Sequence, residues 1–201
     1  MKKSIILMIF VSLVFLAQAQ KIKLVSGNLT FLKGEKSINL QYYYDNVKVG
    51  DMDESNYIKK KVTEYNAKEP GKGDKWLENW KNDRKTRYEP KFEELFNKYL
   101  EEVNTKAKEG DADAKYTLLI KTKMIEPGFN VGVVRRPAKI DVEVEISAAG
   151  SPENKLAELT IFDVPGADAM GFDFDSGERI SEAYAKLGKA LAKYIVKNTV
   201  K

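Results

Sequence analysis

The chain has 201 residues, with 34 Lys and Arg against 30 Asp and Glu, and it contains neither histidine nor cysteine. Without cysteine, disulfides, thiol nucleophiles and zinc–thiolate sites are excluded, and without histidine a Ser-His-Asp triad is impossible. The nearly balanced charge speaks against nucleic acid as a partner, because nucleic-acid binders carry a strong basic excess.

Residues 1–19 have the three parts of a secretory signal peptide. Two lysines precede the apolar run Ile5–Leu16, and Ala17-Gln18-Ala19 supplies small residues at the positions that a signal peptidase reads. The run is shorter than the roughly 20 apolar residues of a membrane-spanning helix. We expect cleavage after Ala19 and, without a cysteine there, no lipid anchor. The mature chain, 20–201, is predicted to be a single domain in the bacterial periplasm or outside the cell, with no transmembrane segment.

The first half of the mature chain is predicted to hold two strands followed by three helices. Residues 21–33 read as extended, and Gly34-Glu35-Lys36 reads as a hairpin turn into the alternating strand Ser37–Tyr44. Breaks at Pro70-Gly71 and Pro90 divide a helical insert at about 53–106. Its three helices are expected at about 53–66, 74–87 and 89–106.

The second half is predicted to hold three strands and a closing helix. The segment 116–125 is rich in β-branched residues, and 138–147 alternates strictly between apolar and charged side chains. A turn then leads into 155–164, which should pair with 138–147 as an antiparallel hairpin. A helix over about 177–197 follows. The order ββαααβββα predicts an α+β sandwich, with a mixed or antiparallel sheet of about five strands and helices packed on it.

The carboxy-terminal half resembles a group of bacterial envelope proteins that are similar to the amino-terminal domain of the translocation protein TolB and to the α/β core of the curli-secretion lipoprotein. The residues that carry this resemblance are Ile125-Glu126-Pro127-Gly128, Ala138–Ser147, Leu159-Thr160-Ile161, the glycine-rich loop after 165 and Ala185–Ala192. The resemblance implies a fold and an envelope setting, and it implies no catalytic residues. The helical insert and the missing lipidation cysteine depart from the pattern, so pore formation is not implied.

Two groups of side chains are candidate contacts for a ligand or partner. Trp76, Trp80 and Arg84 fall on one predicted helix, where aromatic and basic residues together can bind glycans, lipids or proteins. Packing in the core is the ordinary role of such spacing. Phe129, Arg135 and Arg136 lie between two predicted strands, where an arginine pair can hold carboxylates or phosphates, or where the segment is simply a solvated turn.

Two further features have an ordinary structural explanation. Tyr42-Tyr43-Tyr44 places tyrosine on both faces of one strand, which suits packing, with a ligand-contact surface as the alternative. A set of acids near the last helix offers oxygen ligands of the kind that calcium takes, but their spacing does not match a calcium-binding helix-loop-helix. Acids that stabilise a helix start explain them, so no metal is predicted. These acids are Asp163, Asp168, Asp173, Asp175 and Glu178.

These observations predict a non-enzymatic envelope interaction or binding module, whose partner is another envelope protein or a polymer. No glycine-rich phosphate loop is present, and no cofactor is expected. A small-molecule or lipid carrier is the alternative, and it requires an apolar pocket between the sheet and the helices of 76–99. A carboxylate-based hydrolase ranks third, because the spacing of the acids selects no catalytic pair.

Overall fold

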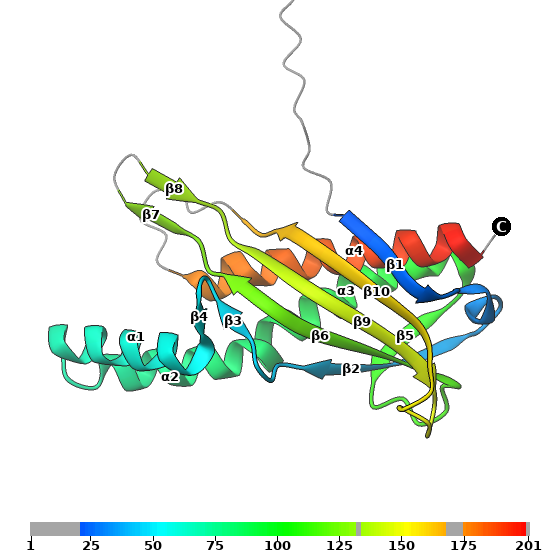
Figure 1. Cartoon of the computed structure of the whole chain (residues 1–201), viewed down its shortest axis with the longest axis horizontal. Coiled ribbons are helices and arrows are strands. Elements are labelled where there is room, and N and C mark those ends of the chain that lie inside the picture. Colours follow the sequence, from blue (N-terminus) through cyan, green and yellow to red (C-terminus); the bar gives the residue numbers. More distant parts are fainter. Residues whose placement is uncertain (1–20, 132–133, 168–174, 200–201) are drawn as a thin grey trace, which may run out of the picture.

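A computed structural model describes residues 21–131, 134–167 and 175–199 (Figure 1). The expected signal peptide, 1–19, lies outside the described residues, as do Asp168 and Asp173. Within the described ranges, no helix combines the length and the apolar character needed to span a membrane.

One mixed sheet of eight strands forms the body of the protein, and a separate two-stranded hairpin extends from it (Figure 1). Six strands lie side by side in the order β1 (Lys21–Gly27), β10 (Lys155–Pro165), β9 (Lys139–Ala148), β6 (Tyr116–Glu126), β2 (Ser37–Tyr43) and β5 (Lys106–Glu109). The short strand β3 (Lys48–Val49) also pairs with β6, and β4 (Met52–Asp53) pairs with β3. The hairpin consists of β7 (Phe129–Val131) and β8 (Val134–Arg136).

The predicted pairing of the last two long strands is confirmed. Val144 of β9 faces Leu159 of β10 in an antiparallel ladder. The apolar residues of β9 are fully buried, whereas Glu143 and Glu145 lie on the opposite face. That outer face carries ion pairs in place of a covering layer: Glu145 accepts both Lys121 at 2.6 Å and Lys155 at 2.9 Å. Strict alternation in the sequence therefore located the covered and the charged face correctly.

The predicted hairpin between the first two strands is wrong. β1 pairs with β10 at one end of the sheet, whereas β2 runs parallel to β6 and β5 near the other end. A 3-10 turn at Thr30–Leu32 lies between them, and the buried side chains of Leu29 and Leu32 fix it against the core. The expected five strands also become eight, because β3, β4 and β5 have only two to four residues and show no readable alternation.

The helices are α1 (Glu54–Lys68), α2 (Lys72–Asp83), α3 (Glu89–Leu100) and α4 (Ser176–Thr199). The second and third predicted helices form one continuous helical segment, joined by a π-helical turn at Arg84–Tyr88. The third ends at Leu100 and not at 106. Asn104 takes a left-handed conformation (φ 54°), and the Asn97 amide bonds both backbone groups of Ala107, at 2.7 and 2.8 Å. The residues after the helix thereby return to the sheet as β5.

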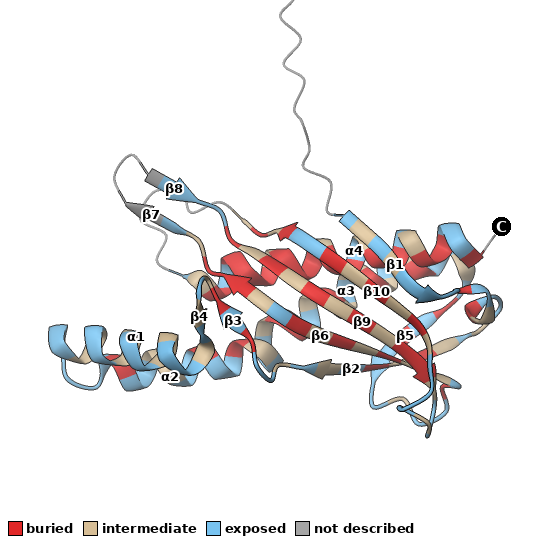
Figure 2. Ribbon diagram, viewed as in Figure 1, coloured by how far each residue is buried: buried red, intermediate tan, exposed pale blue. Residues whose placement is uncertain are grey.

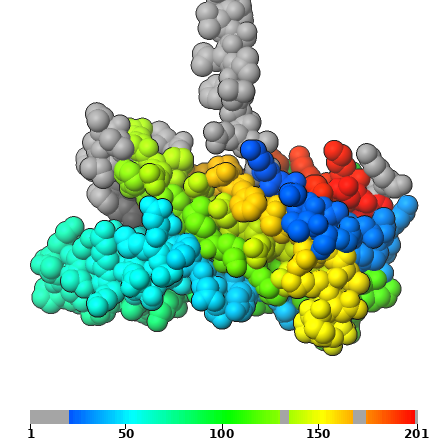
Figure 3. All heavy atoms as spheres, viewed as in Figure 1, coloured from blue at the N-terminus to red at the C-terminus, as the bar shows by residue number. Residues whose placement is uncertain are grey.

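Helices α3 and α4 cover one face of the sheet (Figures 1 and 2), and α1 and α2 project beyond it, as the space-filling view also shows (Figure 3). Tyr42 of β2 lies edge-on to Phe92 of α3, with ring centroids 5.9 Å apart, whereas Tyr43 is exposed. Phe92 also stacks on Phe96, and both side chains are 0% exposed. The core therefore lies between the sheet and α3 and α4, while α1 contributes no buried residue to it.

Glu89, the first residue of α3, provides a test of the polar part of this layer. Burial raises the pKa of its carboxyl, against the opposing effect of the hydrogen bond from Lys85, whose Nζ lies 2.9 Å away. A raised folded-state pKa means that the charged form costs stability once the pH exceeds that pKa. We expect Glu89→Gln to raise the melting temperature at pH 7, and the gain to disappear when the pH falls below about 4.5, the usual pKa of glutamate.

Thermal unfolding of both proteins between pH 4 and 7 measures this difference. A lower melting temperature for Glu89→Gln at pH 7 would show that the bond to Lys85 outweighs the burial of the charge. Lys91→Gln on the same helix is the matched control, since Lys91 is half-buried and its ion pair with Glu94 is long, at 3.3 Å. It should change little.

Candidate functional site

The helical hairpin, formed by α1 and α2 (residues 54–83), owes its shape to three residues at its tip. Gly71 adopts φ 83°, a conformation that glycine takes without strain, and it turns the chain between the helices. Gly73 is buried so closely against α1 that an added Cβ would lie 2.3 Å from the carbonyl oxygen of Val62. The Asn66 side chain accepts a hydrogen bond from the Gly73 N–H at 2.7 Å. The two helices consequently lie in direct backbone contact.

A continuous aromatic cluster fills the space between the two helices. Trp76 and Trp80 of α2 are stacked with ring centroids 5.5 Å apart. Tyr57 of α1 contacts both, at 5.9 and 5.4 Å, and Tyr65 contacts Trp76 at 5.9 Å. The hairpin therefore has a small core of its own, made of rings that reach toward the solvent at the tip.

Trp80 and Arg84 are anchored at the base of this cluster. Trp80 is 3% exposed, and its indole N–H donates to Glu54 Oε1 at 2.7 Å. Arg84 donates to the same oxygen at 2.5 Å, and its guanidinium lies 4.6 Å from the centroid of the Tyr44 ring. Two of the three predicted contact residues thus bind Glu54 of α1, and Arg84 also contacts Tyr44, which directly follows β2. Trp76 alone keeps a half-buried ring in a surface groove.

That groove, which we call the aromatic–lysine groove, has a volume of about 510 Å³. Its lining combines two rings, three ammonium groups and one amide: Tyr65, Trp76, Lys68, Lys72, Lys75 and Asn79. Lys72 pairs with Glu69 at 3.1 Å. Within the described part of the chain, Lys68 and Lys75 have no carboxylate within ion-pair distance, and Lys68 lies 5.9 Å from the Tyr65 ring centroid. The groove is cationic and lacks acidic groups in its lining.

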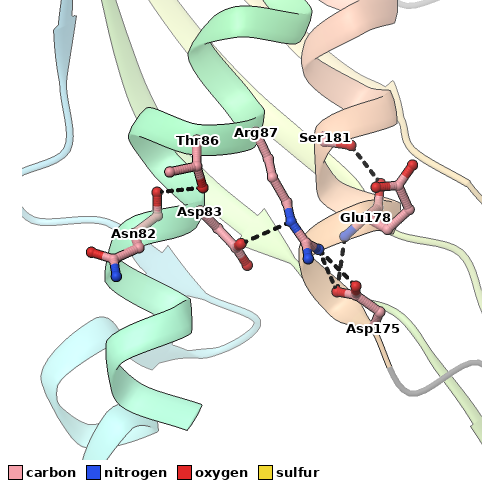
Figure 4. A network of polar contacts seen from close by, with 7 residues as sticks. All are labelled: Asn82, Asp83, Thr86, Arg87, Asp175, Glu178 and Ser181. Carbon is pink, nitrogen blue, oxygen red and sulfur yellow. Dashed lines mark hydrogen bonds and ion pairs between the residues drawn. The ribbon is translucent and has the colours of Figure 1, made fainter. Parts of the chain in front are cut away.

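A second hollow adjoins the groove and shares Trp76 and Asn79 with it. Its volume is about 310 Å³, and its remaining lining residues are Trp80, Asp83, Arg87, Asp175, Ser176 and Gly177. We call it the Asp83 hollow. Figure 4 shows its polar network, in which Arg87 lies between two carboxylates. Its Nη1 is 2.7 Å from both Asp175 oxygens, and its Nε is 3.1 Å from Asp83 Oδ1.

The two carboxylates of this network differ in acidity. Burial raises the pKa of Asp83, although Arg87 opposes the shift. Burial also acts to raise the pKa of Asp175, but the hydrogen bonds from Arg87 and from the backbone of Glu178 lower it overall. Opposite shifts are typical of acid–base pairs in enzymes. Here, however, both oxygens of Asp175 are held by Arg87, and its Oδ1 also accepts the Glu178 N–H at 3.1 Å, so the network ties α4 to the end of α2.

The second predicted group lies on the β7–β8 hairpin. Phe129 is 38% exposed, and the Arg136 guanidinium lies 5.5 Å from the centroid of its ring. Arg136 also pairs with Glu126 at 2.9 Å, while Arg135 is exposed. Arg179, a buried residue of α4, donates to the carbonyl oxygens of Pro127 and Gly128 at the base of this hairpin. No contact between this group and the Trp76 group is found among the described residues, so the six candidates form two separate clusters.

The described acids that were considered as oxygen ligands do not converge. Asp163 pairs with Lys139 at 2.8 Å, whereas Asp175 caps α4 and binds Arg87. Within the described ranges, no group of three acidic side chains is arranged to hold a metal ion. The prediction that these acids stabilise the helix start is confirmed for Asp175.

A carrier would need an apolar pocket between the sheet and the helices, and a small apolar hollow does lie there, away from the aromatic–lysine groove. It has a volume of about 160 Å³, between Ile38 of β2, Leu100 at the end of α3 and Ile195 of α4. Pockets for small molecules measure about 300–1,000 Å³. This hollow is smaller than that range.

The sequence pattern did not lead us to predict several residues of the groove and of the Asp83 hollow. Tyr65 and Lys68 follow Tyr57 and Lys61 at intervals of about two helical turns, so one face of α1 repeats an aromatic and a lysine. That repeat was a readable signal. Asp175 was predicted only as a helix-capping acid, and its contact with Arg87 gave no signal, because the two positions are 88 residues apart.

No protein-family model and no curated protein matches this chain. Among solved structures, a PelC dodecamer from Paraburkholderia phytofirmans has a TM-score of 0.39 and 12% identity, covering 85% of this chain and 98% of that one. A PelC variant dodecamer from the same organism has a TM-score of 0.37 and 11% identity, with the same coverage. Protein XCC0632 from Xanthomonas campestris, of family DUF330, has a TM-score of 0.41 and 9% identity, covering 82% and 85%. At these scores the similarity assigns no family and no function, and the resemblance to TolB stays a prediction.

Proposed function

We propose that this protein is a non-enzymatic binding module of the bacterial envelope that recognises an anionic polymer through the aromatic–lysine groove. The observation that carries the proposal is the lining of that groove: two ring faces beside three ammonium groups, with no carboxylate among them. Ring faces contribute contact area at a small entropic cost, and ammonium groups pair with anionic substituents. The envelope setting rests on the signal-peptide pattern of residues 1–19.

An anionic membrane surface fits the hairpin less well than a polymer. Segments that bind at a lipid interface place large apolar side chains among the acyl chains. The structure describes the whole helical hairpin. The large apolar side chains that are strongly exposed in the described part of the chain all lie outside this hairpin: Val25, Tyr43, Phe129 and Phe162. The hairpin also holds seven lysines against six acids, so it has no marked basic excess.

Binding of polygalacturonate, an acidic polysaccharide, tests the proposal, with neutral dextran and phosphatidylglycerol vesicles as comparison ligands. We expect isothermal titration to show saturable binding of polygalacturonate alone, and Lys68→Gln/Lys75→Gln to weaken it about tenfold or more, consistent with about 1 kcal/mol for each paired charge. The matched control is Lys59→Gln/Lys81→Gln, which removes one exposed lysine from each of the same helices outside the groove.

Equal losses in the two double variants would show a nonspecific charge effect and contradict the assignment of the site. Binding to vesicles but not to polygalacturonate would replace the polymer by a membrane as partner. Shortening of the polymer during incubation, abolished by Asp83→Asn, would contradict the non-enzymatic part of the proposal and favour the carboxylate-based hydrolase.

A further inference from the structure

The aromatic–lysine groove and the Asp83 hollow are neighbouring depressions along α2. They share Trp76 and Asn79, so the half-buried indole of Trp76 lies where they meet. On one side of it stand the ammonium groups of Lys68, Lys72 and Lys75. On the other side stand the carboxylates of Asp83 and Asp175, with Arg87 between them. The combined trough thus changes from cationic to hydrogen-bond-accepting along its length.

Asp83 is the residue that gives the Asp83 hollow a group able to bind a ligand. Its side chain is only 12% exposed, yet it lines the hollow. Arg87 binds Oδ1, whereas Oδ2 accepts no hydrogen bond from any described residue. That oxygen keeps contact with solvent at the hollow, beside Gly177 at the start of α4. A ligand hydroxyl group in the hollow can therefore donate to it.

We propose that the trough binds a segment of at least three or four sugar residues of a carboxylated polysaccharide. Acidic groups at one end of the segment lie at the lysines, one sugar ring lies on Trp76, and hydroxyl groups of the sugar beyond it donate to Asp83 Oδ2. A carboxylated sugar chain carries all three features: anionic substituents, ring faces with C–H groups that pack on an indole, and hydroxyl donors. A lone anion or a single sugar acid meets only the lysine end. This inference rests on the proposed function and specifies the length and orientation of its ligand.

Titration of galacturonic acid and of its linear tetramer tests the inference. We expect the tetramer to bind the wild-type protein at least tenfold more tightly than the monomer, because it reaches both parts of the trough. Asp83→Asn keeps the acceptor for Arg87 but replaces Oδ2 by an N–H₂ donor. It should weaken tetramer binding about tenfold and leave monomer binding unchanged. Lys68→Gln/Lys75→Gln should weaken both.

The outcomes separate this inference from the proposed function. Equal affinity for monomer and tetramer, both lost in Lys68→Gln/Lys75→Gln, would overturn the extended trough and leave the lysine groove in place. No binding of either saccharide would overturn both. If Asp83→Asn fails to fold, Asn79→Ala replaces it, since Asn79 is exposed and lies in both linings. If Asn79→Ala then bound the tetramer as tightly as the wild-type protein does, the proposal that the saccharide extends from the groove into the hollow would be contradicted.

Discussion

Gly188→Val is expected to destabilise the protein by about 3 kcal/mol, at the upper end of the usual cost of overpacking a core. Gly188 lies where α4 crosses α3, and an added Cβ would be 2.4 Å from the carbonyl oxygen of Phe92 and 3.0 Å from the backbone nitrogen of Phe96. These are backbone atoms of a helix, which cannot rotate away as a side chain can. The two helices must separate to admit even one methyl group.

Urea unfolding monitored by circular dichroism measures the change in the free energy of unfolding. Ala190→Val is the matched control, because it adds a β-branched side chain to the same helix at a partly exposed position. We expect it to cost less than about 0.7 kcal/mol, the range of helix propensity. If the two variants proved equally stable, the close approach of α3 and α4 at Gly188 would be contradicted.

Phe92→Ala is expected to cost about 3–5 kcal/mol, the usual range for removing a buried phenylalanine. The ring is 0% exposed and contacts both Phe96 and Tyr42. Its removal therefore leaves a cavity between the sheet and α3. Tyr65→Ala offers a comparison within the helical hairpin, where the ring is only half-buried. Because α1 buries no residue in the core, we expect Tyr65→Ala to leave global unfolding nearly unchanged.

Unfolding curves of both variants measure this contrast. If Tyr65→Ala lowered the free energy of unfolding by a similar amount, the helical hairpin would contribute as much to global stability as the layer between the sheet and α3. A small loss in Phe92→Ala would contradict the placement of the core between the sheet and α3.

The fold was predictable from the sequence wherever one element alone carries the pattern. The alternation in β9 identified its buried face, and the apolar periodicity of α4 located that helix within a few residues of its observed ends. The pairing of β1 with β10 was not predictable, because its apolar positions are compatible with either neighbour. β5 was hidden for a different reason: the side chain of Asn97, and not a pattern in residues 106–109, holds it to α3.

The candidate site was only partly predictable, because it depends on contacts between residues far apart in the sequence. The spacing of Trp76 and Trp80 correctly indicated a shared helix face, but it gave no means of deciding which ring is buried. Trp80 is buried against other rings, and its N–H donates to Glu54, 26 positions earlier. The groove itself needs the contact between α1 and α2, which depends on the close approach at Gly73. Long-range contacts of this kind leave no periodic trace in a sequence.

The two indole groups provide the most direct test of the binding surface, because the chain has two tryptophans with different surroundings. We expect titration of ¹⁵N-labelled protein with the galacturonate tetramer to shift the Trp76 indole signal progressively and to saturation. Backbone signals of 68–79 should move with it. The Trp80 indole N–H, which donates to Glu54 and whose residue lines only the Asp83 hollow, should move less than that of Trp76. Shifts confined to Phe129 and Arg136 of the β7–β8 hairpin, or to the charged face of the sheet, would contradict recognition by the aromatic–lysine groove.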